Sequence, residues 1–201
     1  MRSLNASIGR YTERMYASLP NQLTWARITA IPIFVGVFWL PDDWLSPQQK
    51  NLTATLLFVA AALTDLLDGY IARRYRLTTA FGAFLDPVAD KLIVAAALIM
   101  LVELDRVGAL IAIIIIGREI TISALREWMA KVGASSSVAV SMIGKIKTAA
   151  QMTAIPMLLY HAPLFGVIDV QWLGSWLIYV AAVLTLWSMV YYLRKAAPQS
   201  A

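Results

Sequence analysis

The sequence predicts an all-α, polytopic membrane protein with six transmembrane helices and an N-terminal amphipathic helix on the membrane surface. Of its 201 residues, 60% are hydrophobic and 14% are charged, whereas soluble proteins average about 45–50% and about 25%. The mean hydropathy is +0.68. Six membrane-spanning helices of about 20 residues would take roughly 120 residues. This composition excludes a disordered chain and leaves little room for a soluble domain.

The uncharged runs and the turns between them predict where the helices lie. The runs 148–168 and 170–193 are each long enough to cross a bilayer. Four shorter apolar runs each continue at one end into a stretch that also carries charges. Pro-, Asp-, Gly- or Ser-rich segments at 40–47, 103–106, 132–137 and 161–166 predict turns. The predicted helices are 22–40, 50–74, 83–103, 107–130, 143–161 and 171–195.

The N-terminal segment 1–19 is polar and basic, so it does not resemble a cleavable signal. Its pattern is typical of a basic amphipathic helix lying on the membrane, with Arg2, Arg10 and Arg14 interspersed among Ile8, Tyr11, Met15 and Tyr16. We therefore divide the chain into a juxtamembrane segment, 1–19, and a six-helix domain, 20–201.

The distribution of Lys and Arg predicts the orientation. With six spans, the two termini and the second and fourth connections share one side, which collects Arg2, Arg10, Arg14, Arg27, Arg73, Arg74, Arg76, Lys131, Lys145, Lys147, Arg194 and Lys195. The other side has Lys50 and Arg106. The positive-inside rule places the first side, with both termini, in the cytoplasm. This rule also explains the net charge of +5, so we expect no nucleic-acid partner.

Four aspartates lie near the predicted cytoplasmic ends of the second and third helices. Asp65 and Asp68 share a helix face, as do Asp86 and Asp90. Four carboxylates at membrane depth need counter-charge, and hard divalent cations bind carboxylate oxygens while leaving positions for phosphates. The chain has no Cys, and its one His, His161, falls on the far side. The pattern therefore favours Mg²⁺ or Mn²⁺, present singly or as a pair.

A second group of charges is basic and brackets the Ser-rich connection: Arg118, Arg126, Lys145 and Lys147. Arg118 and Lys145 lie within otherwise apolar helices, where an idle charge is costly, so we interpret them as phosphate ligands. The alternative is membrane anchoring with Arg–Glu pairs to Glu119 and Glu127, and Lys131, Arg194 and Lys195 fit anchoring better. Carboxylates suited to metal beside phosphate-binding cations suggest phosphoryl or phosphatidyl transfer.

Aromatic side chains near the predicted helix ends are interpreted as interfacial anchors. They are Trp25, Trp39, Trp44, Trp172, Trp176, Trp187, Tyr191 and Tyr192.

The acidic residues belong to a longer pattern. It reads Asp65-Leu-Leu-Asp68-Gly69-Tyr-Ile-Ala72-Arg73, followed after eight residues by Gly82, then by Asp86 and Asp90, each after three more residues. This resembles the signature of the CDP-alcohol phosphotransferases at all eight fixed positions. The segments 19–27, 81–91, 118–127 and 144–151 resemble the bacterial branch of this family that uses sn-glycerol 3-phosphate. Small residues such as Gly69, Ala72 and Gly82 fit either close approach of a nucleotide or helix packing.

The resemblance implies six membrane helices, homodimers and a site facing the cytoplasm from the bacterial inner membrane, among membrane lipids. It implies transfer of the phosphatidyl group of CDP-diacylglycerol to sn-glycerol 3-phosphate, with release of CMP. Asp65, Asp68 and Asp86 would hold two metal ions, with Asp90 as a further ligand and the catalytic base. CDP-diacylglycerol would bind at Asn21, Thr24, Asp65, Gly69, Ala72, Arg73 and Gly82. Glycerol 3-phosphate would bind at Arg118, Arg126, Lys145 and Lys147.

Two other functions remain open at this stage. The acceptor could be inositol phosphate, serine or phosphatidylglycerol, although the basic residues favour a phosphorylated acceptor. A small cation transporter also carries acids at membrane depth, but it would place them near the midplane, whereas these aspartates lie toward one end of their helices.

Overall fold

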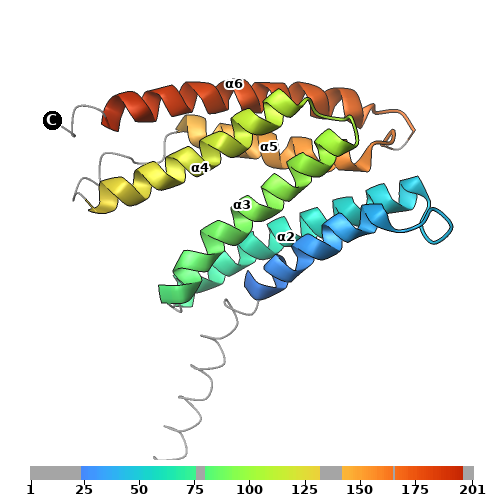
Figure 1. Cartoon of the computed structure of the whole chain (residues 1–201), viewed down its shortest axis with the longest axis horizontal. Coiled ribbons are helices and arrows are strands. Elements are labelled where there is room, and N and C mark those ends of the chain that lie inside the picture. The colour runs from blue at the N-terminus through green and yellow to red at the C-terminus, as the bar shows by residue number, and fades with distance from the viewer. Residues whose placement is uncertain (1–23, 76–79, 132–141, 165, 197–201) are drawn as a thin grey trace, which may run out of the picture. The chain divides into compact units, whose positions relative to one another are not determined.

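The computed structural model describes residues 24–75, 80–131, 142–164 and 166–196; within these helices, the side chains of 68–75, 80–84, 142, 143, 145, 195 and 196 are not described. Nearly all of the described chain is helical (Figure 1). The helices are Thr24–Trp39, α2 (Pro47–Tyr75), α3 (Ala80–Glu103), α4 (Ala109–Lys131), α5 (Met142–Tyr160) and α6 (Val170–Ala196). The all-helical prediction is confirmed, and the proposed surface helix lies outside the described residues.

The predicted boundaries agree closely with the observed ones, and the largest differences are at the starts of α2 and α3, each of which begins three residues earlier than predicted. The sequence predicts a start near residue 50, but α2 begins at Pro47. The backbone N–H of Ser46 donates to Gln49 Oε1 at 2.9 Å, and the N–H of Gln49 donates to Ser46 Oγ at 3.4 Å. This reciprocal capping box, with Pro at the first helical position, begins the helix inside the segment interpreted as a turn.

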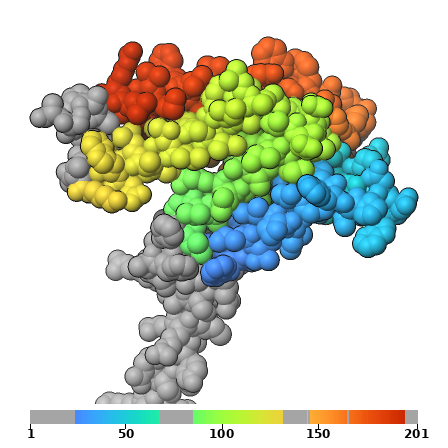
Figure 2. Space-filling view, viewed as in Figure 1, coloured from blue at the N-terminus to red at the C-terminus, as the bar shows by residue number. Residues whose placement is uncertain are grey.

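The chain divides into two compact units, Met1–Ala96 and Ala97–Ala201. The first contains helix Thr24–Trp39, α2 and the first part of α3. Its buried apolar side chains include Phe34, Ala54, Phe58 and Ile93, with exposed fractions of 5% or less. The helix Thr24–Trp39 forms part of the surface of this unit (blue in Figure 2).

In the second unit, α6 packs along both α5 and α4 (Figure 1). Gly174 allows α6 to approach α5 closely: a Cβ atom there would lie 3.0 Å from Leu158 Cγ and 3.3 Å from the carbonyl oxygen of Ala154. Leu158 and Ala154 are themselves fully buried. A small residue at a helix–helix contact is the usual device where packing must be tight within lipid.

Among the described residues, two helical segments are long and apolar enough to cross a membrane, Pro47–Leu67 and Val170–Arg194, with only 22% and 33% of their apolar windows buried. Large apolar side chains lie exposed along both, among them Leu52, Leu56 and Leu63 on α2 and Trp176, Val183 and Trp187 on α6. Outward-facing apolar surface on long helices indicates contact with lipid. These helices support a membrane protein; the six-span topology stays a prediction.

The aromatic anchors mostly agree with this setting. Trp25, Trp39, Trp44, Trp172, Trp176, Trp187 and Tyr191 have exposed fractions of 49–82%. Tyr192, however, is only 1% exposed, so the prediction that it anchors at the interface is wrong. Its ring packs in a cluster with Ile122 and Met129 of α4, because it lies on the face of α6 that contacts α4.

Candidate active site

The predicted acidic residues of the first unit converge on the start of helix Thr24–Trp39. The Thr24 hydroxyl donates a hydrogen bond to Asp86 Oδ1. One turn later on the same helix, Arg27 Nη1 lies 2.5 Å from Asp90 Oδ1 and 3.2 Å from Asp65 Oδ1. Three helices thus bring three of the four signature aspartates to a single polar patch. We call Thr24, Arg27, Asp65, Asp86 and Asp90 the acidic cluster.

The carboxylates of the acidic cluster are partly exposed, whereas its cation is buried. The Asp65 and Asp90 side chains are 40% and 36% exposed, while the Arg27 side chain is 1% exposed. Asp65 and Asp86 both lie close enough to repel the Asp90 carboxylate. Among the described side chains, one guanidinium faces three carboxylates, and this excess of negative charge favours binding of a further cation.

The donor chemistry of the acidic cluster fits a hard divalent cation, because every candidate ligand is a carboxylate oxygen. Among the residues with described side chains, no three His, Cys, Asp or Glu groups close around a common point that could hold a metal. Instead, Asp65 and Asp90 are drawn onto Arg27, and Asp86 onto Thr24.

The other predicted residues of this region are placed by their backbone alone. Asp68, Gly69, Ala72 and Arg73 belong to the last part of α2, and Gly82 belongs to the first turn of α3. Their side chains are outside the described set, as is Asn21 altogether.

The second unit holds a cluster of opposite sign. Glu119 of α4 accepts a hydrogen bond from Lys147 Nζ of α5, and its Oε1 lies 3.3 Å from Arg118 Nη1. The Arg118 and Lys147 side chains are only 7% and 3% exposed. Arg126 lies close enough to repel the Lys147 ammonium. We call Arg118, Glu119, Arg126 and Lys147 the cationic cluster. Its buried positive charges exceed its negative charge, as an anion-binding site requires.

Residues of α6 complete the surroundings of Arg118. Its Nη2 donates to Ser188 Oγ at 3.3 Å, and its guanidinium carbon lies 5.9 Å from the centre of the Tyr192 ring. Among the described residues, the buried Arg118 Nε has no hydrogen-bond partner, and neither do the buried Gln151 Oε1 and Thr185 Oγ1. Buried polar atoms normally have partners, so this part of the unit has hydrogen-bonding capacity in reserve.

The anchoring interpretation, with its Arg–Glu pairs, is confirmed in part, and phosphate binding stays a prediction. Glu119 pairs with Arg118 as the anchoring interpretation expected, but it is shared with Lys147 in a buried site. Lys131 and Glu127 form an exposed pair at 2.9 Å, in agreement with anchoring. The side chain of Lys145 is outside the described set.

Sequence reasoning missed Arg27 and the shared role of Glu119. Arg27 was counted only as a cytoplasmic charge, yet it lies three residues after Thr24 and therefore on the same face of its helix. That spacing was the available signal. The partners of Arg27 lie in distant parts of the sequence, so nothing local identified them.

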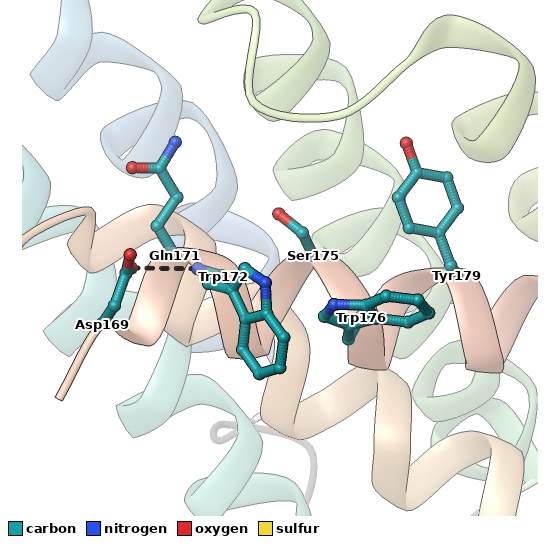
Figure 3. Close-up of a pocket in the computed structure, with 6 residues that line it drawn as sticks. All are labelled: Asp169, Gln171, Trp172, Ser175, Trp176 and Tyr179. Atoms are coloured by element: carbon teal, nitrogen blue, oxygen red, sulfur yellow. Dashed lines mark hydrogen bonds between the residues drawn. The ribbon is translucent and has the colours of Figure 1, made fainter.

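A separate hollow of about 480 Å³ lies along the start of α6 (Figure 3). The Trp172 and Trp176 rings, 6.0 Å apart, and Tyr179 line it. The Asp169 carboxylate accepts from the N–H of Trp172 and caps the helix. The hollow contains none of the predicted site residues and no cationic side chain, so it is not a candidate for phosphate chemistry.

The site chemistry indicates a class of protein, a transferase of phosphate-linked groups. Carboxylates suited to a divalent cation and a buried cationic cluster, both on helices, are the groups that such a reaction uses. The chain belongs to the CDP-alcohol phosphatidyltransferase family, whose model matches residues 17–187. This family generally depends on divalent metal ions.

Curated relatives make the comparison more specific. The chain is 50% identical over 184 residues to a CDP-diacylglycerol–glycerol-3-phosphate 3-phosphatidyltransferase of Shigella flexneri serotype 5b, covering 90% of this chain and 96% of the relative. The same identity and coverage are found for the protein of this name from Escherichia coli strain K12.

Proposed function

We propose that this protein transfers the phosphatidyl group of CDP-diacylglycerol to sn-glycerol 3-phosphate, forming phosphatidylglycerophosphate and CMP. The observation that carries the proposal is the 50% identity over 90% of the chain with relatives named for this activity. The two charged clusters support it independently, since one suits a metal-bound diphosphate and the other a phosphorylated acceptor.

In this proposal Asp65, Asp68, Asp86 and Asp90 hold Mg²⁺ or Mn²⁺, with two ions in each site. A bound divalent cation neutralises negative charge on the phosphoryl oxygens and on the leaving group. The nucleotide and diphosphate of CDP-diacylglycerol bind at Asn21, Thr24, Asp65, Gly69, Ala72, Arg73 and Gly82. The small residues among these let phosphates approach the backbone.

Asp90 is the catalytic base. It accepts the proton of the acceptor hydroxyl while that oxygen forms a bond to the β-phosphorus of CDP-diacylglycerol. The bond between this phosphorus and the bridging oxygen breaks in line, and CMP leaves with the electron pair. The partial exposure of the Asp90 side chain, 36%, supports this role because the base must be reached by the substrate.

Arg118, Arg126, Lys145 and Lys147 bind the phosphate of glycerol 3-phosphate. The support is the buried pair Arg118 and Lys147, which share one carboxylate. A phosphate dianion entering such a site meets preorganised donors with little competing water.

The proposed setting is the bacterial inner membrane, with six spans, both termini and the active site in the cytoplasm, and two copies forming a homodimer. Segment 1–19 lies on the membrane surface and 20–201 forms the catalytic domain. The exposed apolar faces of α2 and α6 support contact with lipid.

The test is an acceptor panel. Purified protein is supplied with CDP-diacylglycerol, Mg²⁺ or Mn²⁺, and either glycerol 3-phosphate, serine, inositol phosphate or phosphatidylglycerol, and CMP release is measured. We expect release with glycerol 3-phosphate and loss of activity in EDTA. Release with another acceptor but not with glycerol 3-phosphate would overturn the assignment.

A further inference from the structure

Arg27 occupies an unusual position in the acidic cluster. Its guanidinium is almost completely buried, and the same nitrogen, Nη1, contacts Asp90 Oδ1 at 2.5 Å and Asp65 Oδ1 at 3.2 Å. A buried arginine is stable only when its charge is matched, and two ionised carboxylates that contact the same nitrogen repel each other unless a cation lies between them. Arginine and acids therefore stabilise one another.

The contacts of Arg27 use the oxygens that a metal would need. Carboxylate oxygen is the ligand of a hard divalent cation, and the Arg27 guanidinium donates to one oxygen of each of two proposed metal ligands. A divalent cation bound to the same two carboxylates would repel the guanidinium, even if it used their other oxygens. Metal binding is therefore expected to weaken the contacts that Arg27 makes.

We propose that Arg27 is a built-in counter-ion that holds Asp65 and Asp90 together in the metal-free protein and gives way as the divalent cation binds. Arg27 lowers the affinity of the acidic cluster for metal, and it stabilises the same cluster when no metal is bound. Arg27 is thus a positioning residue for the metal ligands rather than a catalytic residue. This inference rests on the proposed function only in requiring a divalent cation at these aspartates.

The Thr24 contact is consistent with this arrangement. Thr24 lies one turn before Arg27 and holds Asp86 by a neutral hydrogen bond. The helix Thr24–Trp39 therefore contributes one charged and one uncharged partner to the acids of α2 and α3. Only the charged partner competes electrostatically with a metal, so Arg27 and Thr24 should differ in their effect on metal affinity.

The experiment compares Arg27→Gln with wild type in detergent, following thermal unfolding in EDTA and across a Mg²⁺ titration. We expect Arg27→Gln to unfold at a lower temperature than wild type in EDTA. Mg²⁺ should raise the unfolding temperature of the variant more than that of wild type, and half of this rise should be reached at about tenfold lower Mg²⁺ concentration. Binding of Mn²⁺, followed by its electron paramagnetic resonance signal, should tighten to the same extent. An equal or smaller Mg²⁺-dependent rise, or weaker Mn²⁺ binding, would overturn the proposal.

Three variants control the interpretation. Lys50→Gln removes another largely buried cation of the same unit, which pairs with Asp42 at 2.6 Å, and should leave the Mg²⁺-dependent rise unchanged. Arg27→Lys keeps the charge and should bind Mn²⁺ as tightly as wild type does. This variant also tests the proposal if Arg27→Gln does not fold, because tenfold tighter Mn²⁺ binding by Arg27→Lys would contradict the counter-ion role. The double variant with Arg27→Gln and Asp90→Asn should show a smaller drop in unfolding temperature in EDTA than the sum of the drops in the two single variants.

These measurements need no turnover. A protein that failed to use glycerol 3-phosphate could still show the Arg27 effect on metal, and an active enzyme could lack it. Failure of this inference and failure of the proposed function are therefore distinguishable.

Discussion

The acidic cluster of the first unit and the cationic cluster of the second follow the same plan with opposite signs. In the first, one guanidinium contacts two carboxylates; in the second, one carboxylate contacts a guanidinium and an ammonium. Each cluster keeps its like charges together through a single opposite charge and retains a surplus. The acidic surplus fits a cation, and the cationic surplus fits an anion.

The two clusters differ in which charges are buried. In the acidic cluster, the Asp65 and Asp90 side chains are 40% and 36% exposed, whereas in the cationic cluster the Arg118 and Lys147 side chains are 7% and 3% exposed. Water screens exposed charges and weakens their interactions, while buried charges interact strongly. The difference suggests an acidic cluster that exchanges hydrated ions and a cationic cluster that binds phosphate in a dry environment.

The largest effect is expected at Asp90, the residue assigned to proton transfer. Asp90→Asn should lower turnover by about 10³-fold or more, because an amide cannot accept the proton, while CDP-diacylglycerol still binds. Initial rates and a direct lipid-binding assay measure the two quantities. Asp42→Asn, which changes an exposed acid paired with Lys50, should have near-normal turnover. Near-normal turnover in Asp90→Asn itself would remove Asp90 as the base.

The next largest effect is expected from the buried cations. Lys147→Ala and Arg118→Ala should each raise the KM for glycerol 3-phosphate by about 10- to 100-fold, with a smaller change in the KM for CDP-diacylglycerol. Steady-state kinetics with each substrate varied in turn separates the two constants. Lys131→Ala is the matched control, because Lys131 pairs with Glu127 in an exposed position. Equal effects on both KM values would argue against an acceptor site at the cationic cluster.

The helices and the signature aspartates could be predicted from the sequence, whereas the bridging charges of the two clusters could not. The six helices were predictable because charges interrupt the apolar runs at regular intervals, and Asp65, Asp86 and Asp90 were identifiable from their spacing and the family signature. Arg27 and Glu119 were not identified as bridging charges, because such a charge is recognised by partners on other helices. The start of α2 was missed for a local reason, a capping box hidden in a Pro- and Asp-rich segment.

A smaller effect is expected for Glu119→Gln, which tests whether the two clusters are true counterparts. If Glu119 competes with phosphate as Arg27 is proposed to compete with metal, removing its charge should lower the KM for glycerol 3-phosphate by about 3- to 5-fold. The phosphate-free protein should unfold at lower temperature, and inorganic phosphate should restore part of the loss. Glu127→Gln provides the exposed control on the same helix. A higher KM in Glu119→Gln would mean that Glu119 positions the cations rather than competing for them.

The smallest effect is expected at a third polar group, where the connection after α5 meets that before α4. There Arg106 donates to the carbonyl oxygens of Leu158 and Leu159 at 3.1 and 2.8 Å and caps the end of α5. His161 follows this helix end, and burial together with the nearby Arg106 lowers its pKa below the usual 6.5, although Asp169 acts in the opposite direction. The ordinary pKa of a histidine lies near neutrality, so the charge of His161 changes over an accessible pH range.

The sign of the resulting pH dependence follows from the lowered pKa of His161. As pH falls below 6.5, the unfolded chain binds a proton at His161 before the folded chain does, so stability decreases until the folded pKa is passed. Above 6.5 both states are neutral and the contribution is constant. The His161→Gln variant should therefore lose less free energy of unfolding than wild type between pH 7 and 5, by about 1 kcal/mol or less. Thermal unfolding of both proteins across this range measures the difference. Parallel curves for the two proteins would show that burial and the nearby Arg106 do not lower the pKa of His161.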